Sequence, residues 1–233
     1  MTLPPGQHAV DGFPRFGTHL HHPPPEIPVN PVLAVCGELN EPLAVAVAKL
    51  ASLPRRELTA DFHCVAGWSA TNLHWEGVRF ETFYRHVIEP ALLPDTTITH
   101  IVFAGLDGYR WTALAEDALA EDVLIADVLD GRPLDTDHGA PARLVSPNQY
   151  GYVSVKHLSR IELLTNGPPE NHGAPSRFAE GALRSPLIKP HRRARVWNEE
   201  RHRYLPGWSL RAPYRLLIPS IRFLSARGAR PKL

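Results

Sequence analysis

The fold is decided by the stretch Asp61-Phe62-His63-Cys64-Val65-Ala66-Gly67-Trp68-Ser69. Apolar and polar residues alternate from Glu57 to Cys64, which predicts a strand, and Gly67 predicts a turn directly after it. A cysteine between a strand and a turn offers the soft sulfur ligand that a thiophilic redox metal needs. Cys64 is therefore the first candidate site residue.

Two other interpretations of Cys64 remain open from its own neighbourhood. A free cysteine between Phe62 and Val65 is commonly a small buried hydrophobe. A thiol nucleophile is the other alternative, but His63 is a strand neighbour and points to the opposite face, so it is poorly placed to accept the thiol proton. The second cysteine, Cys36, ends an apolar run and is expected in the core.

Composition excludes several classes of protein. The chain has 233 residues, long enough for one well-filled core, and its formal net charge is only +1, which gives no electrostatic reason to bind nucleic acid. Two cysteines make no disulfide framework, and no run approaches the length of apolar sequence that spans a bilayer. The residues after Met1 show no export signal, so we expect a cytoplasmic protein.

Three segments are expected along the chain. Residues 1–30 are rich in Pro and His and should form an extended arm over the surface, while residues 31–165 show the patterns of a globular domain. Residues 166–233 begin as a Gly/Pro-rich connection and become a basic, aromatic tail, in which Pro213 and Pro219 should limit helix length. The tail suits a membrane surface, a partner groove or its own domain, and the sequence leaves these alternatives open.

The globular part alternates short elements of both kinds. Helices are predicted at 43–50, 80–87 and 114–119, and strands at 32–36, 57–64, 97–104, 123–129, 143–145, 152–155 and 161–164. This order lacks regular βαβ spacing and predicts an α+β fold with a mixed, largely β core.

Four motifs together resemble a known family, the sulfite-oxidase-like molybdopterin-binding oxidoreductases. They are the Cys64 run, His138-Gly139-x-Pro141-x-Arg143, Tyr150-Gly151-Tyr152 and Ser154-x-Lys156, in the family's order and approximate spacing between Pro31 and Leu164. The resemblance implies the family's fold and a molybdenum-molybdopterin cofactor.

The resemblance also implies roles for individual residues. Cys64 would bind molybdenum, since a thiolate is soft and is held deprotonated by the metal. Arg143, Ser154 and Lys156 would hold the phosphate of the pterin, with Val155 between them. Gly139 would let the backbone approach the cofactor, and His138 would hydrogen-bond the pterin.

A turn on the substrate side is implied at Asp107-Gly108-Tyr109. Asp107 and Tyr109 would position substrate or a proton, although Asp-Gly is also a common turn. Trp68, Ser69 and His74 are further candidates for the wall over the metal.

Differences between this sequence and the family's motifs indicate which branch of the family it resembles. The Asn-Arg-Arg element that follows the metal cysteine in sulfite oxidases proper is replaced here by Val65-Ala66-Gly67-Trp68-Ser69, which brings no positive charge. The run is more similar to the Cys-Val-x-x-Trp-Ser pattern of the bacterial protein-methionine-sulfoxide reductase catalytic subunit, although that branch is exported. A dimerisation domain and a haem-attachment motif are not seen.

These observations predict an enzyme that transfers oxygen atoms in two-electron steps. Sulfoxide or N-oxide reduction is favoured over sulfite oxidation, and a separate haem, flavin or iron-sulfur protein is needed as the electron partner. The alternatives are a non-catalytic binding protein on the same fold and a thiol enzyme that uses Cys64 directly.

Overall fold

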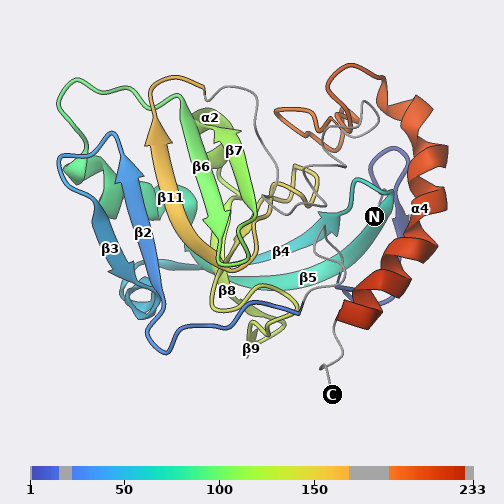
Figure 1. The fold of residues 1–233 in the computed structure, drawn as a ribbon, viewed down its shortest axis with the longest axis horizontal. Coiled ribbons are helices and arrows are strands. Elements are labelled where there is room, and N and C mark those ends of the chain that lie inside the picture. Colours follow the sequence, from blue (N-terminus) through green and yellow to red (C-terminus); the bar gives the residue numbers. More distant parts are fainter. Residues whose placement is uncertain (1, 16–22, 168–188, 229–233) are drawn as a thin grey trace.

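Two mixed β-sheets form the body of the molecule, with a long helix at one side (Figure 1). The structure is a computed structural model that describes residues 2–15, 23–167 and 189–228. The strands of the sheet that carries Cys64 are β1 (His8–Ala9), β4 (Arg55–His63), β5 (Trp68–Arg79), β8 (Leu124–Leu129), β9 (Arg132–Pro133) and β10 (Arg143–Val145). Within it β5 is central, because it pairs with β1, β4 and β8.

The second sheet has the order β3-β2-β11-β6-β7. Its strands are β2 (Val32–Gly37), β3 (Leu43–Ala46), β6 (His100–Gly105), β7 (Arg110–Leu114) and β11 (Leu158–Leu164). Only β11 and β2 run parallel in this sheet. The expected α+β fold with a largely β core is confirmed.

The main apolar core combines buried residues from both sheets, such as Val35 and Phe103 from one and Val78 and Ile125 from the other. The neighbour of Ile125, Leu124, belongs to a second apolar cluster. Since successive side chains of a strand point to opposite faces, this second cluster lies on the other face of the Cys64 sheet. That face is therefore buried as well.

The second cluster gathers distant parts of the chain around Cys64. Trp68 and Trp75 come from β5, while Leu210 and Tyr214 come from the helix α4 (Gly207–Gly228). Phe13 of the N-terminal arm packs against the same cluster. The two segments outside the expected domain thus cover one face of its sheet.

Most helical segments are short. They are η1 (Val47–Ser52), α1 (Phe80–Phe83), the π-helical turn η2 (Tyr84–Ile88), η3 (Glu89–Ala91) and α2 (Ala115–Ala118). The helix predicted at 43–50 is wrong in its first half, because Leu43–Ala46 pairs with β2 as an edge strand. A short alternating run is ambiguous, and pairing with β2 decides it.

Two further predictions need correction. Residues 152–155 are not a strand, because Val153 and Ser154 donate to Tyr150 and Gly151 in local turns, and β10 pairs with β8 instead. The prolines do not shorten α4, which continues through Pro213 and Pro219 for 22 residues. Each proline lacks an amide hydrogen, so one carbonyl group in the preceding turn loses its helical partner. One side of this helix is exposed, and carbonyl groups on that side are hydrated instead.

Among the described residues, no helix is long and apolar enough to cross a membrane. The run His19 to His22 of the expected arm lies outside the described residues.

Candidate functional site

Cys64 directly follows β4, in a tight turn that leads into β5. Its amide donates to the carbonyl of Trp68 at 2.8 Å, and its carbonyl accepts from Gly67 at 2.9 Å. Gly67 has φ of +101°, and a Cβ there would lie 2.9 Å from the carbonyl of Gly6. The turn therefore requires a residue without a side chain, and it fixes the direction of the free Cys64 thiol.

The N-terminal arm and the C-terminal segment both contact this turn. The Gln7 side chain donates to the carbonyl of Cys64 at 3.0 Å. Arg201, which is fully buried, donates through one amino group to Val65 and through the other to Pro5. Cys64 itself is only 7% exposed. Cys64 is thus buried where three separate segments of the chain meet.

Burial is the main influence on the Cys64 thiol. It raises the pKa of Cys64 to about 12, although a backbone hydrogen bond from Ala66 and the charge of Arg201 act in the opposite direction. A thiol with such a pKa is protonated at neutral pH when no metal is bound. Binding to a metal ion is one way to stabilise the thiolate in this position.

His63 does not serve as a base for Cys64. Its Nδ1 lies 2.7 Å from the Ser69 hydroxyl, which donates to Gln7 at 3.0 Å. Burial also lowers the pKa of His63, so the ring is neutral at neutral pH. This agrees with the expectation that neighbouring residues of the strand point to opposite faces.

A second group of functional side chains is cationic. Arg143 is fully buried, and it donates to the carbonyls of His138 at 2.9 Å and Ser154 at 3.2 Å. Lys156 donates to the carbonyl of Asp137 at 2.6 Å. Within the described ranges, neither cation forms an ion pair with a carboxylate. The charges of Asp137 and Asp107 do act on Lys156, but they are weaker than the effect of burial.

The pKa values of Arg143 and Lys156 are both lowered. Burial lowers the pKa of Arg143 to about 9. Burial, together with the charges of Arg143 and Arg15, lowers the pKa of Lys156 to about 7. Such shifts mean that the folded chain holds these cations at a cost. A bound anion would remove that cost.

Aromatic rings surround the Arg143 guanidinium. Its central carbon lies 5.6 Å from the ring centroid of Phe13, 5.4 Å from that of Phe62 and 5.2 Å from that of Trp75. These distances allow cation–π attraction, which partly offsets the loss of water. The arm residue Phe13 thus helps to form the cationic pocket.

Phe62 and Gly151 connect the cysteine turn to the cationic pocket. Phe62 precedes Cys64 by two residues and reaches Arg143, while the amide of Gly151 donates to the carbonyl of His63 at 2.7 Å. A Cβ on Gly151 would lie 2.1 Å from the tip of the Phe62 ring. Packing through Phe62 and Gly151 therefore links the cysteine turn to the side chain of Arg143.

The other predicted cofactor-binding residues lie around this pocket. His138 contacts Asp135 through Nδ1 and the carbonyl of Phe13 through Nε2, both at 2.7 Å. Gly139 has φ of +110°, and a Cβ there would lie 3.2 Å from the Arg143 Cβ. The Ser154 hydroxyl accepts from the amide of Ser146 at 3.2 Å, and Val155 is buried in the main core.

Ser154 and Lys156 do not reach the pocket from one strand face as expected. The segment around Ser154 consists of turns, and it is the Ser154 carbonyl that contacts Arg143. The backbone amides of this segment donate to carbonyls within the same turns, so they do not form the hydrogen bonds that would pair the segment with a strand.

The residues predicted to lie on the substrate side do not form one group in the structure. They are Asp107, Tyr109, Trp68, Ser69 and His74. The amide of Tyr109 donates to Asp107 at 3.0 Å, and the Tyr109 hydroxyl donates to the carbonyl of Tyr152 at 2.6 Å. Burial raises the pKa of Tyr109, so it stays protonated at neutral pH. His74 is exposed and contacts Thr59, whereas Trp68 and Ser69 are buried close to the cysteine turn.

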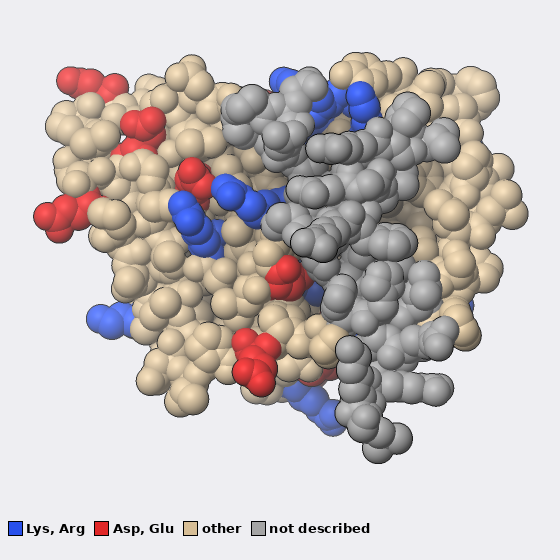
Figure 2. All heavy atoms as spheres, viewed as in Figure 1, with Lys and Arg blue, Asp and Glu red and all other residues tan. Residues whose placement is uncertain are grey.

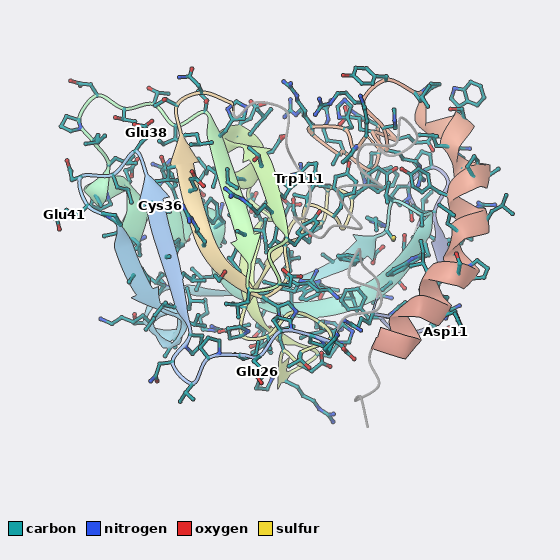
Figure 3. All side chains as sticks on the ribbon, in the orientation of Figure 1. Asp11, Glu26, Cys36, Glu38, Glu41 and Trp111 are labelled. Atoms are coloured by element: carbon teal, nitrogen blue, oxygen red, sulfur yellow. The ribbon has the colours of Figure 1, made fainter. Side chains whose placement is uncertain are left out.

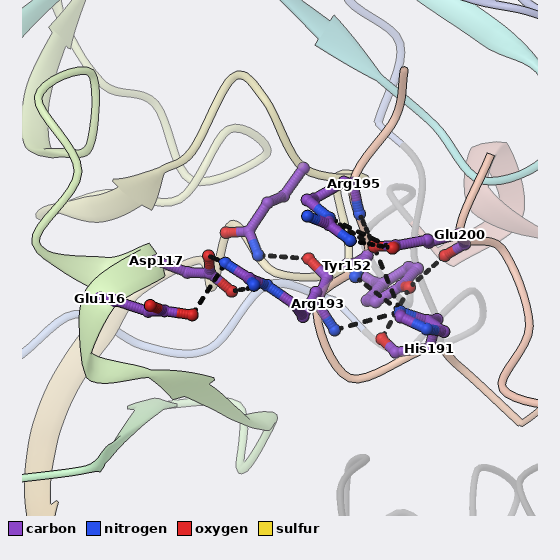
Figure 4. A network of polar contacts seen from close by, with 9 residues as sticks. Glu116, Asp117, Tyr152, His191, Arg193, Arg195 and Glu200 are labelled. Carbon is purple, nitrogen blue, oxygen red and sulfur yellow. Dashed lines mark hydrogen bonds and ion pairs between the residues drawn. The ribbon is translucent and has the colours of Figure 1, made fainter. Parts of the chain in front are cut away.

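A polar network attaches the C-terminal segment to the domain (Figure 4). Arg193 forms ion pairs with Glu116 and Asp117, and Arg195 pairs with Glu200 at 2.5 Å. The Tyr152 hydroxyl lies within 3.4 Å of the carbonyls of His191 and Glu200. Glu200 immediately precedes Arg201, so this network holds Arg201 over the cysteine turn.

Several residues of the site were missed from the sequence. Gln7, Phe13 and Arg201 come from the segments that were expected to be a surface arm and a docking tail. The sequence gives no signal for Arg201, because a buried arginine within a basic run has the same pattern as a solvated one. Contacts between residues nearly two hundred positions apart are not visible in local patterns.

Comparison with known proteins identifies the family. A family model described as "Oxidoreductase molybdopterin binding domain" matches residues 21–177. The chain belongs to this family. It is therefore an enzyme that binds a molybdopterin cofactor, as the four motifs predicted.

Relatives of this family include characterised and uncharacterised proteins. The uncharacterized oxidoreductase YuiH of Bacillus subtilis is 30% identical over 72% of this chain and 81% of its own length. The protein-methionine-sulfoxide reductase catalytic subunit MsrP of Gluconobacter oxydans is 27% identical over 78% of this chain. That of Campylobacter jejuni is 24% identical over 73% of it. The alignments span 62% and 61% of the lengths of these two reductases.

A solved structure supports the fold. The sulfane dehydrogenase SoxCD of Paracoccus pantotrophus matches with a TM-score of 0.54 and 22% identity, over 66% of this chain and 42% of that one. The fold is thus the sulfite-oxidase-type molybdopterin fold.

The residues present fit this cofactor. The cofactor has a sulfur-bound metal at one end and a phosphate at the other, and the site has a buried thiol and an unbalanced pair of cations joined through Phe62. Cys64 would hold the metal, and Arg143 and Lys156 would hold the phosphate.

Proposed function

We propose that this protein catalyses two-electron oxygen-atom transfer, with the Cys64 thiolate as a ligand of molybdenum. One observation carries the proposal: a buried thiol with a raised pKa lies in a turn that packs through Phe62 against Arg143, and Arg143 and Lys156 are cations with lowered pKa values that form no ion pair among the described residues. A ligand with a soft metal at one end and an anion at the other satisfies both groups at once.

The chain's own residues have three tasks in this proposal. The bound cofactor supplies the two-electron exchange and the oxygen-atom chemistry. Arg143 and Lys156 bind and orient its charged end, and Phe13 and Phe62 exclude water from that contact. Gln7 and Arg201 fix the backbone of the cysteine turn, so that the thiol keeps one direction.

A sulfoxide or N-oxide is favoured over sulfite as the substrate. The turn after Cys64 carries no cation, and the Arg201 amino groups are used for the carbonyls of Val65 and Pro5 rather than for an anion. Two relatives are named as methionine-sulfoxide reductases. A neutral oxide substrate needs no fixed positive charge.

A separate protein supplies or removes the electrons in this proposal. The relatives are named as catalytic subunits, a term that implies a further subunit. We also propose the cytoplasm as the location, because Cys36 and Cys64 are both free thiols, which suits a reducing compartment. Fractionation of cells that express the protein at natural levels tests this point.

Direct thiol catalysis has little support. A nucleophilic thiol needs a lowered pKa and a base, whereas burial raises the pKa of Cys64 and His63 is bonded to Ser69. A non-catalytic binding protein would not need the unbalanced cations.

Metal and pterin content provide the test. The purified chain, expressed with molybdate and with cofactor synthesis intact, should contain about one molybdenum and one pterin. Cys64→Ser should lose the metal and all activity in a dye-linked assay on a panel of sulfoxides and N-oxides. Cys36→Ser is the matched control, because Cys36 lies on β2 in the other sheet (Figure 3). Full molybdenum in the Cys64 variant would contradict the ligand assignment.

A further inference from the structure

Exposed apolar side chains are concentrated in one part of the molecule. Seven large apolar residues that face solvent belong to the segment 197–223, and three others are scattered elsewhere at Val29, Val32 and Leu93. The seven are Trp197, Tyr204, Leu205, Trp208, Leu216, Leu217 and Phe223. A cluster of this kind on an otherwise well-buried chain indicates a surface that is covered in use.

The inner face of α4 accounts for only some of its apolar residues. Leu210 and Tyr214 are buried against the Cys64 cluster, and Ile218 packs against it one turn later. These positions are four residues apart and form one stripe along the helix. The tail therefore does wrap its own domain, through this stripe.

A second apolar stripe runs along the opposite face of α4, with spacings of three or four residues. Its large members are 68%, 81% and 61% exposed at Trp208, Leu216 and Phe223, and Ala212 and Pro219 are exposed between them. At about 100° per residue, these positions lie roughly opposite Leu210 and Tyr214. In Figure 1, α4 lies at the edge of the molecule. Because Leu210 and Tyr214 pack against the Cys64 sheet, the stripe on the opposite face of the helix is turned to solvent.

Arginines line one side of the exposed stripe. Arg211, Arg215 and Arg222 lie four and seven residues apart, and Gly207–Gly228 contains no acidic residue. Arg211 pairs with Glu199 at 2.7 Å, while Arg215 and Arg222 are exposed. Figure 2 shows acidic and basic side chains interspersed over the face viewed. Along α4, by contrast, the row beside the apolar stripe carries charge of one sign only.

We propose that the outer face of α4 binds the surface of an anionic lipid bilayer. Trp, Leu and Phe would enter the boundary between headgroups and acyl chains, while the arginines would contact anionic headgroups. The helix would lie along the surface, because it is not apolar enough to span the membrane. This proposal does not depend on the reaction that the enzyme catalyses.

A second copy of the chain fits this face less well. Two copies of α4 related by a twofold axis present the same surface to each other, which would bring arginine rows together with no carboxylate on either helix. An anionic bilayer offers both the apolar layer and the opposite charge. The charge pattern therefore selects the bilayer.

Vesicle sedimentation of the full chain tests the proposal. Binding should be strong to vesicles of phosphatidylcholine with about one quarter phosphatidylglycerol, weak to pure phosphatidylcholine, and weaker at high salt. Leu216→Ser combined with Phe223→Ser should reduce binding at least about tenfold. Arg222→Gln alone should reduce it about fivefold on the anionic vesicles.

Matched controls use exposed residues elsewhere. Leu93→Ser and Arg132→Gln change the same side-chain types on other surfaces and should bind as the original chain does. Circular dichroism should be unchanged in every variant, since all substituted side chains face solvent. Equal binding to both vesicle types, or unchanged binding by the double α4 variant, would overturn the proposal. So would light scattering that shows a dimer which only the double variant dissociates.

Discussion

The guanidinium carbon of Arg201 lies 5.0 Å from the centroid of the Tyr150 ring, and both side chains are fully buried. From this position Arg201 donates to Val65, the residue after Cys64, and to Pro5 of the N-terminal arm. One side chain thus joins the cysteine turn, the N-terminal arm and the C-terminal segment.

Replacement of Arg201 by Met should destabilise the chain without cofactor. The substitution removes the donor to the half-buried carbonyl of Val65 and the donor to the carbonyl of Pro5, at a cost of about 1–2 kcal/mol in the free energy of unfolding. Urea unfolding of the cofactor-free protein measures this value, and Arg132→Met, at an exposed position, is the control. Equal stability of the two variants would show that Arg201 does not fasten the arm to the cysteine turn.

Stability of the cofactor-free chain should rise with pH between 7 and 8.5. Burial lowers the pKa of Lys156 to about 7, against about 10.4 in an unfolded chain. In this range the unfolded chain binds more protons than the folded chain, so each step up in pH favours folding. Tyr109 stays protonated in both states over this range, because its pKa is raised in the folded chain. Cys64 acts in the opposite direction near the upper end, because its pKa is raised in the folded chain while a thiol of the unfolded chain titrates at about 8.5, so the rise is steepest between pH 7 and 8.

Lys156→Met provides the control for this pH dependence. Thermal midpoints of the variant should change less with pH, and at pH 7 it should be the more stable chain, because no buried cation remains at that position. A slope equal to that of the original chain would rule out Lys156 as its source.

Arg143→Lys should keep the fold and weaken the hold on the cofactor. Lysine retains the charge but not the planar fork, so at least one charge-assisted hydrogen bond to the phosphate is lost. Retention of pterin through dialysis should fall at least about tenfold, because a charge-assisted hydrogen bond is worth about 1.5–3 kcal/mol and about 1.4 kcal/mol corresponds to a factor of ten. Complete pterin retention with normal folding would place the phosphate elsewhere.

Gly151→Ala should disturb both halves of the site through Phe62. The new Cβ would lie 2.1 Å from the tip of the Phe62 ring. This ring is held between two others, with its centroid 4.9 Å from that of Phe13 and 6.0 Å from that of Trp68. Overpacking of this kind costs about 1–3 kcal/mol. The cost should shrink when Phe62→Leu is present, and a double-mutant cycle on urea unfolding measures the coupling. Strict additivity would contradict a direct clash.

The sequence predicted much of the fold, because local patterns specify it. The strand that ends at His63 and the strand Leu124–Leu129 have clear alternation or apolar runs, and both were found close to the expected bounds. The strand predicted at 152–155 was wrong. A run of residues that favour strands does not reveal that its amides donate to carbonyls in local turns. Pairing partners are a property of the whole chain.

The site was less visible than the fold. The family resemblance directed attention to Cys64 and Arg143, which are both buried and are linked through the ring of Phe62. Phe13, Gln7 and Arg201 escaped notice because their contacts depend on long-range packing. An apolar stripe on each face of α4 was hidden for a different reason: two overlapping periodic patterns look like an unpatterned apolar run.

The bond from Arg201 to Pro5 joins residues 196 positions apart. During synthesis, the cysteine turn and the cationic pocket emerge from the ribosome long before residue 201 does. The nascent chain therefore passes through a stage in which its sulfur and its cations are present while one side of their enclosure is still missing. That interval offers a large prosthetic group an open entrance, which the last part of the chain afterwards narrows.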